Sequence, residues 1–75
     1  MRTCKVGDIV MDAATGSREQ YTVIEVDDSE RADDPLVICE RRQKPYARYA
    51  QYHVVIAFRM SDLDAGRVII IKRVK

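Results

Sequence analysis

The residues best suited to chemistry lie in one segment, Arg41 to His53. This segment holds four Arg or Lys side chains and three of the four tyrosines of the chain, and it has no acidic residue. Cations neutralise phosphates and release counterions, while aromatic faces stack on unpaired bases. The pattern therefore predicts a surface that binds nucleic acid or a nucleoprotein. Its members are Arg41, Arg42, Lys44, Tyr46, Arg48, Tyr49 and Tyr52.

A purely structural interpretation of this segment stays open. The tyrosines would then cover the core, with the stems of the Arg and Lys side chains packed over them. The formal net charge of the chain is only +1, whereas a typical nucleic-acid module has a stronger basic footprint. Lys72, Arg73 and Lys75 would extend the basic patch if the last strand lies beside it.

An acidic stretch between residues 27 and 34 suggests a different function. Its carboxylates would form a docking surface for a basic protein partner, and the residues concerned are Asp27, Asp28, Glu30, Asp33 and Asp34. A calcium site is not expected, because an EF-hand loop requires glycine at its sixth position and Ala32 stands there. Two cysteines and one histidine also do not match a zinc pattern, so we expect neither a metal nor a cofactor.

Candidate catalytic residues are sparse. His53 is the only histidine, and a general base needs a reacting group or an orienting partner within hydrogen-bond reach. Cys39 lies in an apolar run, where a small buried side chain is the expected role, and Cys4 is distant from it in sequence. Asp62 and Asp64 are expected to cap a turn. We therefore expect a protein that is not an enzyme.

The charges divide between the two halves of the chain. Residues 1–40 hold four basic and ten acidic residues, a net charge of −6. Residues 41–75 hold nine basic and two acidic residues, a net charge of +7. This asymmetry suggests polar partners. It also has a structural interpretation, because an antiparallel sheet can place the two halves side by side and pair their charges.

Length and composition limit the architecture. A chain of 75 residues fits one domain, residues 1–75, because it is too short to build two cores. It is 47% hydrophobic and 33% charged, which excludes collagen-like and wholly disordered chains. No apolar run approaches the roughly 20 residues of a membrane span, and we recognise no signal peptide. Two cysteines are too few for a disulfide framework, so the expected location is the cytoplasm.

Strand patterns dominate the chain. We expect strands over residues 5–13, 20–27, 36–40, 52–60 and 67–73. The second of these alternates, so one face should hold Thr22, Ile24 and Val26 and the other Tyr21, Val23 and Glu25.

Two further segments are expected to contain helix. Tyr46, Tyr49 and Tyr52 recur every three residues, which favours an irregular or helical insertion to about Gln51, although a period of two also runs from Tyr46 to Phe58. Residues 61–66 fit a single helical turn that Ser61 caps and Gly66 ends.

Five strands with a helical turn before the last one predict an all-β fold, a five-stranded small barrel. This order resembles the SH3-like barrel, and in particular small barrels with a KOW-type opening. The segments that carry the resemblance are Val6-Gly7-Asp8-Ile9-Val10, Tyr21-Thr22-Val23-Ile24-Glu25-Val26 and Ser61-Asp62-Leu63. The chain departs from the KOW pattern at Gln20, where that motif usually has glycine. SH3-like barrels bind peptides, RNA or DNA, or serve as structure, so the resemblance implies a fold and not one activity.

Two strands are apolar on both faces. The segments Val54–Phe58 and Val68–Ile71 lack the alternation that a sheet with one solvated face should have. Their outer face therefore needs a cover, either the tyrosine segment or a second copy of the chain. If a second copy of the chain is the cover, the protein is a homodimer.

Together these patterns predict a non-catalytic binding module. The leading hypothesis is nucleic-acid or nucleoprotein binding through residues 41–53. The alternative is a protein-interaction or inhibitor module that uses residues 27–34 or the two-sided strands. As a compact chain with no expected cofactor, the protein also resembles small accessory proteins of phages and mobile elements, including anti-defence proteins.

Overall fold

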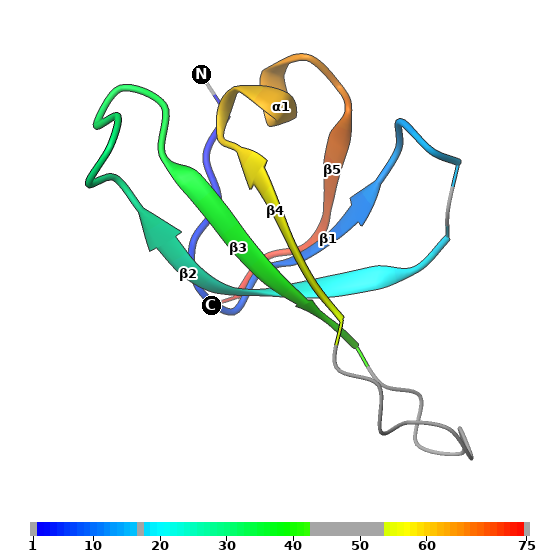
Figure 1. Cartoon of the computed structure of the whole chain (residues 1–75). Coiled ribbons are helices and arrows are strands. Elements are labelled where there is room, and N and C mark those ends of the chain that lie inside the picture. Colours follow the sequence, from blue (N-terminus) through cyan, green and yellow to red (C-terminus); the bar gives the residue numbers. More distant parts are fainter. Residues whose placement is uncertain (1, 17, 43–53, 75) are drawn as a thin grey trace.

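The computed structural model describes residues 2–16, 18–42 and 54–74. Five antiparallel strands form one sheet in the order β4-β3-β2-β1-β5 (Figure 1). The elements are β1 (Ile9–Asp12), β2 (Gln20–Asp27), β3 (Leu36–Arg41), β4 (Val55–Arg59), α1 (Ser61–Asp64) and β5 (Val68–Lys72). This arrangement confirms the predicted all-β class and the short helix before the last strand.

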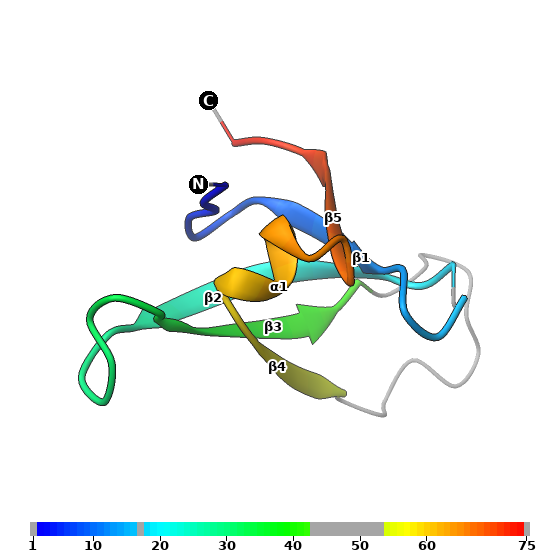
Figure 2. The ribbon, with the colours of Figure 1, turned by 90° about the horizontal axis from the view of Figure 1, so that it is seen from above.

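The sheet curls, and β4 and β5 form its two edges. Among the described residues, β4 pairs with β3 and β5 pairs with β1, while β4 and β5 do not pair with each other. Seen from above, the strands step across the molecule from β5 to β4, and α1 links these two edges (Figure 2). The described sheet is therefore open between β4 and β5. No helix in the described part of the chain is long and apolar enough to cross a membrane.

One apolar cluster fills the inside of the curled sheet. Alternate residues of each strand point into it, as a half-buried strand requires. The buried members are Cys4, Val10, Tyr21, Val23, Val37, Cys39, Phe58, Met60, Leu63 and Val68. Leu63 is the only buried residue of α1, so this short helix is held mainly by one side chain.

The alternation in β2 changes at a bulge between Val23 and Glu25. Tyr21 and Val23 are buried together, as the period of two predicts. Ile24 is 41% exposed, whereas Val26 packs against the core. The predicted common face for Thr22, Ile24 and Val26 is therefore wrong, because the extra residue of the bulge shifts the alternation by one position.

The helical turn keeps its predicted end but not its predicted cap. Gly66 has a φ of 77°, a conformation that glycine takes without strain, and it follows the last turn as predicted. Ser61, however, does not cap α1, because the N-cap residue is Met60 and no side chain makes a capping bond there. The Ser61 hydroxyl instead donates to Asp34 Oδ2 at 2.9 Å.

A buried carboxylate joins the two ends of the fold. Asp8 has 0% exposure, and its oxygens accept the backbone N–H of Lys5 at 3.0 Å and that of Val74 at 2.8 Å. Gly7 has a φ of 98°, and a Cβ on it would lie 3.2 Å from side-chain atoms of Val74. Gly7 and Asp8 therefore hold the C-terminal segment against the start of β1.

The acidic and basic halves of the chain lie side by side and pair their charges. This supports the structural interpretation of the charge asymmetry. Ion pairs that join the two halves are Arg41–Glu19, Arg59–Glu30 and Arg73–Asp8, with N···O distances of 3.6, 3.3 and 4.0 Å.

Candidate functional site

The predicted nucleic-acid surface is described only where it begins. Arg41 ends β3 and Arg42 follows it, whereas the other five predicted members, Lys44, Tyr46, Arg48, Tyr49 and Tyr52, lie outside the described residues, as does His53. The question whether residues 43–51 form a helix or a strand lies outside them as well.

The two described arginines make contacts with the start of β2. Arg41 Nη1 lies 3.6 Å from Glu19 Oε1, and Arg42 Nη1 donates to Gln20 Oε1 at 2.9 Å. Arg18 is exposed and immediately precedes Glu19, so a third arginine from a distant part of the sequence lies at this end of the sheet. The last strand does not lie beside β3, because β1 and β2 separate them.

The acidic residues 27–34 lie at the opposite end of the β2–β3 hairpin (Figure 1). Most of their carboxylates make hydrogen bonds or ion pairs within the fold. Asp34 accepts the Ser61 backbone N–H and hydroxyl, both at 2.9 Å, and Glu30 lies 3.3 Å from Arg59. The remaining contacts are from Asp27 to the Ser29 N–H and from Asp33 to Arg31. Asp28 is exposed. The loop is therefore docked onto the start of α1.

The hydrogen bonds from Ser61 set the titration of Asp34. The Ser61 backbone N–H holds the pKa of Asp34 below its ordinary value, and the hydroxyl acts in the same direction. A carboxyl group with a lowered pKa stabilises the folded state above its unfolded-state pKa, and this stabilisation is lost as the pH falls through the folded-state pKa.

Replacing Ser61 with Ala removes the hydroxyl donor and keeps the backbone N–H, so it should raise the pKa of Asp34 part of the way towards its ordinary value. The acid side of the stability profile should then become slightly shallower. Carbon-13 NMR titration of the carboxyl groups measures the shift. Asp27 serves as an internal control, because its pKa is lowered by Ser29 and not by Ser61. An unchanged pKa of Asp34, or a pKa of Asp27 that moves with it, would show that the Ser61 hydroxyl does not help to lower the pKa of Asp34.

Both cysteines are buried in the apolar core. The Cys4 Sγ lies 3.8 Å from the Met60 Sδ. Burial raises the pKa of Cys4 to about 11 and that of Cys39 to about 12. Thiols with such values are neutral at physiological pH, and a nucleophile or a metal ligand must be a thiolate. Cys39 is fully buried, which confirms its expected role as a small core side chain.

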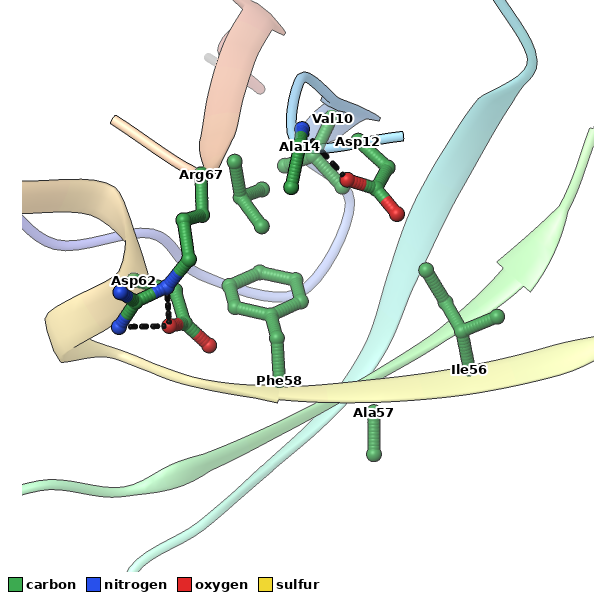
Figure 3. Close-up of a pocket in the computed structure, with 9 residues that line it drawn as sticks. Val10, Asp12, Ala14, Ile56, Ala57, Phe58, Asp62 and Arg67 are labelled. Carbon is green, nitrogen blue, oxygen red and sulfur yellow. Dashed lines mark hydrogen bonds and ion pairs between the residues drawn. The ribbon is translucent and has the colours of Figure 1, made fainter. Parts of the chain in front are cut away.

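A pocket of about 360 Å³ lies where the sheet is open, between β4 on one side and β1 and β5 on the other (Figure 3). Phe58 and Ile56 point into it from β4, and Val10 faces them from β1. The side chain of Ala57 points away from the pocket, so Ala57 contributes its main chain to the lining. The complete lining is Val10, Asp12, Ala14, Ile56, Ala57, Phe58, Asp62, Arg67 and Val68.

Charged residues stand around the apolar floor of this pocket. Arg67 Nε and Nη2 both lie 2.7 Å from Asp62 Oδ1, which makes a paired group at one end. Asp12 Oδ1 accepts the Ala14 N–H at 2.9 Å, and its second oxygen points into the open space of the pocket (Figure 3). The lining thus carries two carboxylates and one guanidinium, so its formal charge is negative.

Among the described residues, no strand pairs with the edge of β4 that lies beside the pocket. Arg41 N–H donates to Val54 O at 2.9 Å at one end of the β3–β4 ladder, and Met60 N–H donates to Pro35 O at 2.9 Å at the other. Hydrogen-bonded pairs alternate along an antiparallel ladder, so Val55 and Ala57 occupy the non-bonded positions opposite Glu40 and Ile38. Their N–H and C=O groups therefore point away from β3, towards the open edge.

The two-sided strands are exposed on their outer face, so the cover that the sequence analysis expected is not found among the described residues. Val55 is 51% exposed on β4, and Ile69 and Ile71 are 41% and 45% exposed on β5. The pattern identified these strands, but it did not identify the pocket residues Asp12, Ala14 and Arg67. They gave no signal of their own, because Asp12 and Ala14 lie at and just after the end of β1 and Arg67 lies just before β5, and only the curl of the sheet brings these two places together.

Comparisons with known proteins assign no family to the chain. A scan against protein-family models, a search of curated proteins and a search of solved structures each found no match.

Proposed function

We propose that the chain is a non-catalytic protein-interaction module that binds its partner in the pocket between β4 and β1–β5. The observation that carries the proposal is a pocket with an apolar floor running beside an unpaired strand edge. Its volume falls within the roughly 300–1,000 Å³ of known ligand pockets, which also combine apolar walls with a few polar groups. The free, buried thiols suit a reducing compartment, so we place the protein in the cytoplasm.

We further propose that the frame is an SH3-like small barrel. The strand order, the short helix between β4 and β5, and the Gly-Asp opening support this assignment. In such a barrel, the opening between β4 and β5 would be the place where the partner binds. No enzymatic role is proposed, since the described thiols are buried and neutral.

Nucleic-acid binding is the second candidate, and one observation favours it. Arg18 joins Arg41 and Arg42 at the end of the sheet where the basic segment begins. We rank it second because Arg41 and Arg42 contact Glu19 and Gln20 within the fold. The positive charge of the described part of this surface is therefore partly balanced within the fold, which the sequence pattern did not indicate.

A pair of matched variants tests the pocket. Ala14 lines the pocket and Ala32 is exposed in the acidic loop, so Ala14→Trp should block the pocket while Ala32→Trp adds the same bulk elsewhere. Peptides selected from a randomised library against the wild-type protein should bind Ala32→Trp normally and lose about tenfold or more in affinity for Ala14→Trp, as when a well-packed side chain is excluded.

Fluorescence anisotropy with the purified selected peptides gives these affinities. The same instrument compares single-stranded DNA, single-stranded RNA and duplex DNA at two salt concentrations. Peptides that bind both Trp variants equally well, or salt-sensitive nucleic-acid binding without any selected peptide, would overturn the proposal.

A further inference from the structure

We infer that the partner supplies an extended segment, basic and apolar, which adds to β4 as a sixth antiparallel strand. This inference rests on the proposed function and names the occupant of the same pocket. The argument for it comes from the main chain of β4, from the faces of an added strand and from the charge of the pocket.

The unpaired groups of β4 define a short ladder. Val55 and Ala57 present N–H and C=O groups towards the open edge, and they are spaced two residues apart as successive bonding positions of an antiparallel ladder are. The next such N–H, that of Arg59, is already taken, because it donates to Asp62 Oδ2 at 3.0 Å. Asp62 thus closes the ladder at the α1 end, and an added strand would pair with Val55 and Ala57.

The faces of an added strand follow from this register. A residue paired with Ala57 must point to the outer face, as Ala57 does (Figure 3). Its two neighbours must point inwards, beside Ile56 and Phe58, and so enter the pocket. A partner segment therefore needs apolar side chains at alternate positions, and the positions between them are free to vary.

The charge of the pocket favours a cation among the inward-facing positions. Asp62 is paired with Arg67 at 2.7 Å, whereas the second oxygen of Asp12 points into the pocket (Figure 3). A lysine or arginine two residues from the apolar side chain would reach Asp12 and meet an acceptor that is partly shielded from water. An acidic residue at that position would be repelled.

The test uses synthetic peptides whose backbone, and not only their side chains, is changed. The probe is the capped hexapeptide Thr-Val-Thr-Lys-Thr-Val, in which Val and Lys face inwards and Thr faces outwards. Methylating the three Thr nitrogens removes the N–H groups on the edge of the peptide that faces β4, two of which would pair with Val55 and Ala57. Methylating the Val and Lys nitrogens removes N–H groups that face solvent. We expect the first peptide to lose about tenfold or more in affinity, because two hydrogen bonds are removed, and the second to bind within about threefold of the parent.

Two variants at one position make the matching change in the protein. Ala57→Pro removes the edge N–H without breaking a bond to β3, because proline is accepted on an edge strand when its nitrogen faces outwards. Ala57→Thr keeps the N–H and serves as the control. The parent peptide should lose about tenfold in affinity for Ala57→Pro and bind Ala57→Thr almost normally. Replacing Lys in the peptide with Glu should weaken binding to the wild-type protein.

The outcomes separate this inference from the proposed function. If library peptides are lost on Ala14→Trp but bind Ala57→Pro and Ala57→Thr equally, the pocket binds proteins without strand addition and the inference is wrong. If the hexapeptide does not bind while library peptides do, the inference also fails. If sedimentation shows a wild-type dimer that Ala57→Pro converts to monomer, the occupant of the edge is a second copy of the chain, which overturns the inference as well.

Discussion

Replacing Asp8 with Ala is expected to lower the free energy of unfolding by about 2–5 kcal/mol, as the loss of a buried acceptor that serves two donors implies. The carboxylate has 0% exposure and binds the N–H groups of Lys5 and Val74. Alanine would leave both N–H groups without their acceptor. It would also free the segment after β5 from the start of β1. A domain of this size has a total stability of only about 5–10 kcal/mol, so the loss is a large share of it.

Urea unfolding followed by circular dichroism measures this change. Asp28→Ala is the matched control, because Asp28 is an exposed aspartate of the acidic loop, and it should stay within about 0.5 kcal/mol of the wild type. Asp8→Asn should fall between the two, since an amide oxygen can accept one of the two bonds while the amide nitrogen opposes the other. An Asp8→Ala protein as stable as Asp28→Ala would show that the two chain ends are held by other contacts.

Replacing Leu63 with Ala is the second large effect, with an expected loss of about 2–4 kcal/mol, typical of removing a buried leucine. Leu63 is 1% exposed and is the only buried residue of α1. The helix has four residues, too few to be stable without tertiary contacts. Losing this side chain should therefore loosen the whole connection between β4 and β5, including the Asp62–Arg67 pair at the end of the pocket.

Thermal and urea unfolding measure this loss, and hydrogen exchange at Ala65 and Gly66 reports on the helix itself. Ile69→Ala is the control, because this substitution removes a similar side-chain volume from a position that is 41% exposed. It should lower the free energy of unfolding by about 1 kcal/mol or less. Equal losses for Leu63→Ala and Ile69→Ala would contradict the role given to Leu63.

Several elements could be predicted from the sequence because their causes are local. The strand predicted over residues 20–27 matches β2, since turn residues bound it and its side chains alternate. Gly66 was identified as the end of α1 because only its conformational freedom is involved. The burial of Cys39 followed from the apolar run around it.

The failures have causes that lie elsewhere in the chain. Ser61 looked like a helix cap, but Asp34, 27 residues away in sequence, takes its hydroxyl. The bulge after Val23 arises from pairing with β3, and the alternation of β2 alone does not contain it. The pocket depends on the curl of the whole sheet, so residues such as Asp12 and Arg67 could not be grouped in advance. The charge asymmetry gave a correct hint of pairing between the halves, but it could not show which partners pair.

The most direct test of the central claim, that the pocket beside β4 is a binding site for a protein segment, is a map of amide chemical-shift changes. Nitrogen-15-labelled protein is titrated with the Thr-Val-Thr-Lys-Thr-Val peptide and, in a separate sample, with single-stranded DNA. We predict saturable shifts from the peptide at Val55, Ala57 and Ala14, and much smaller shifts at Arg18 and Arg42. Peptide shifts that are absent from β4, together with saturable DNA shifts at Arg18 and Arg42, would contradict the claim and favour the nucleic-acid surface.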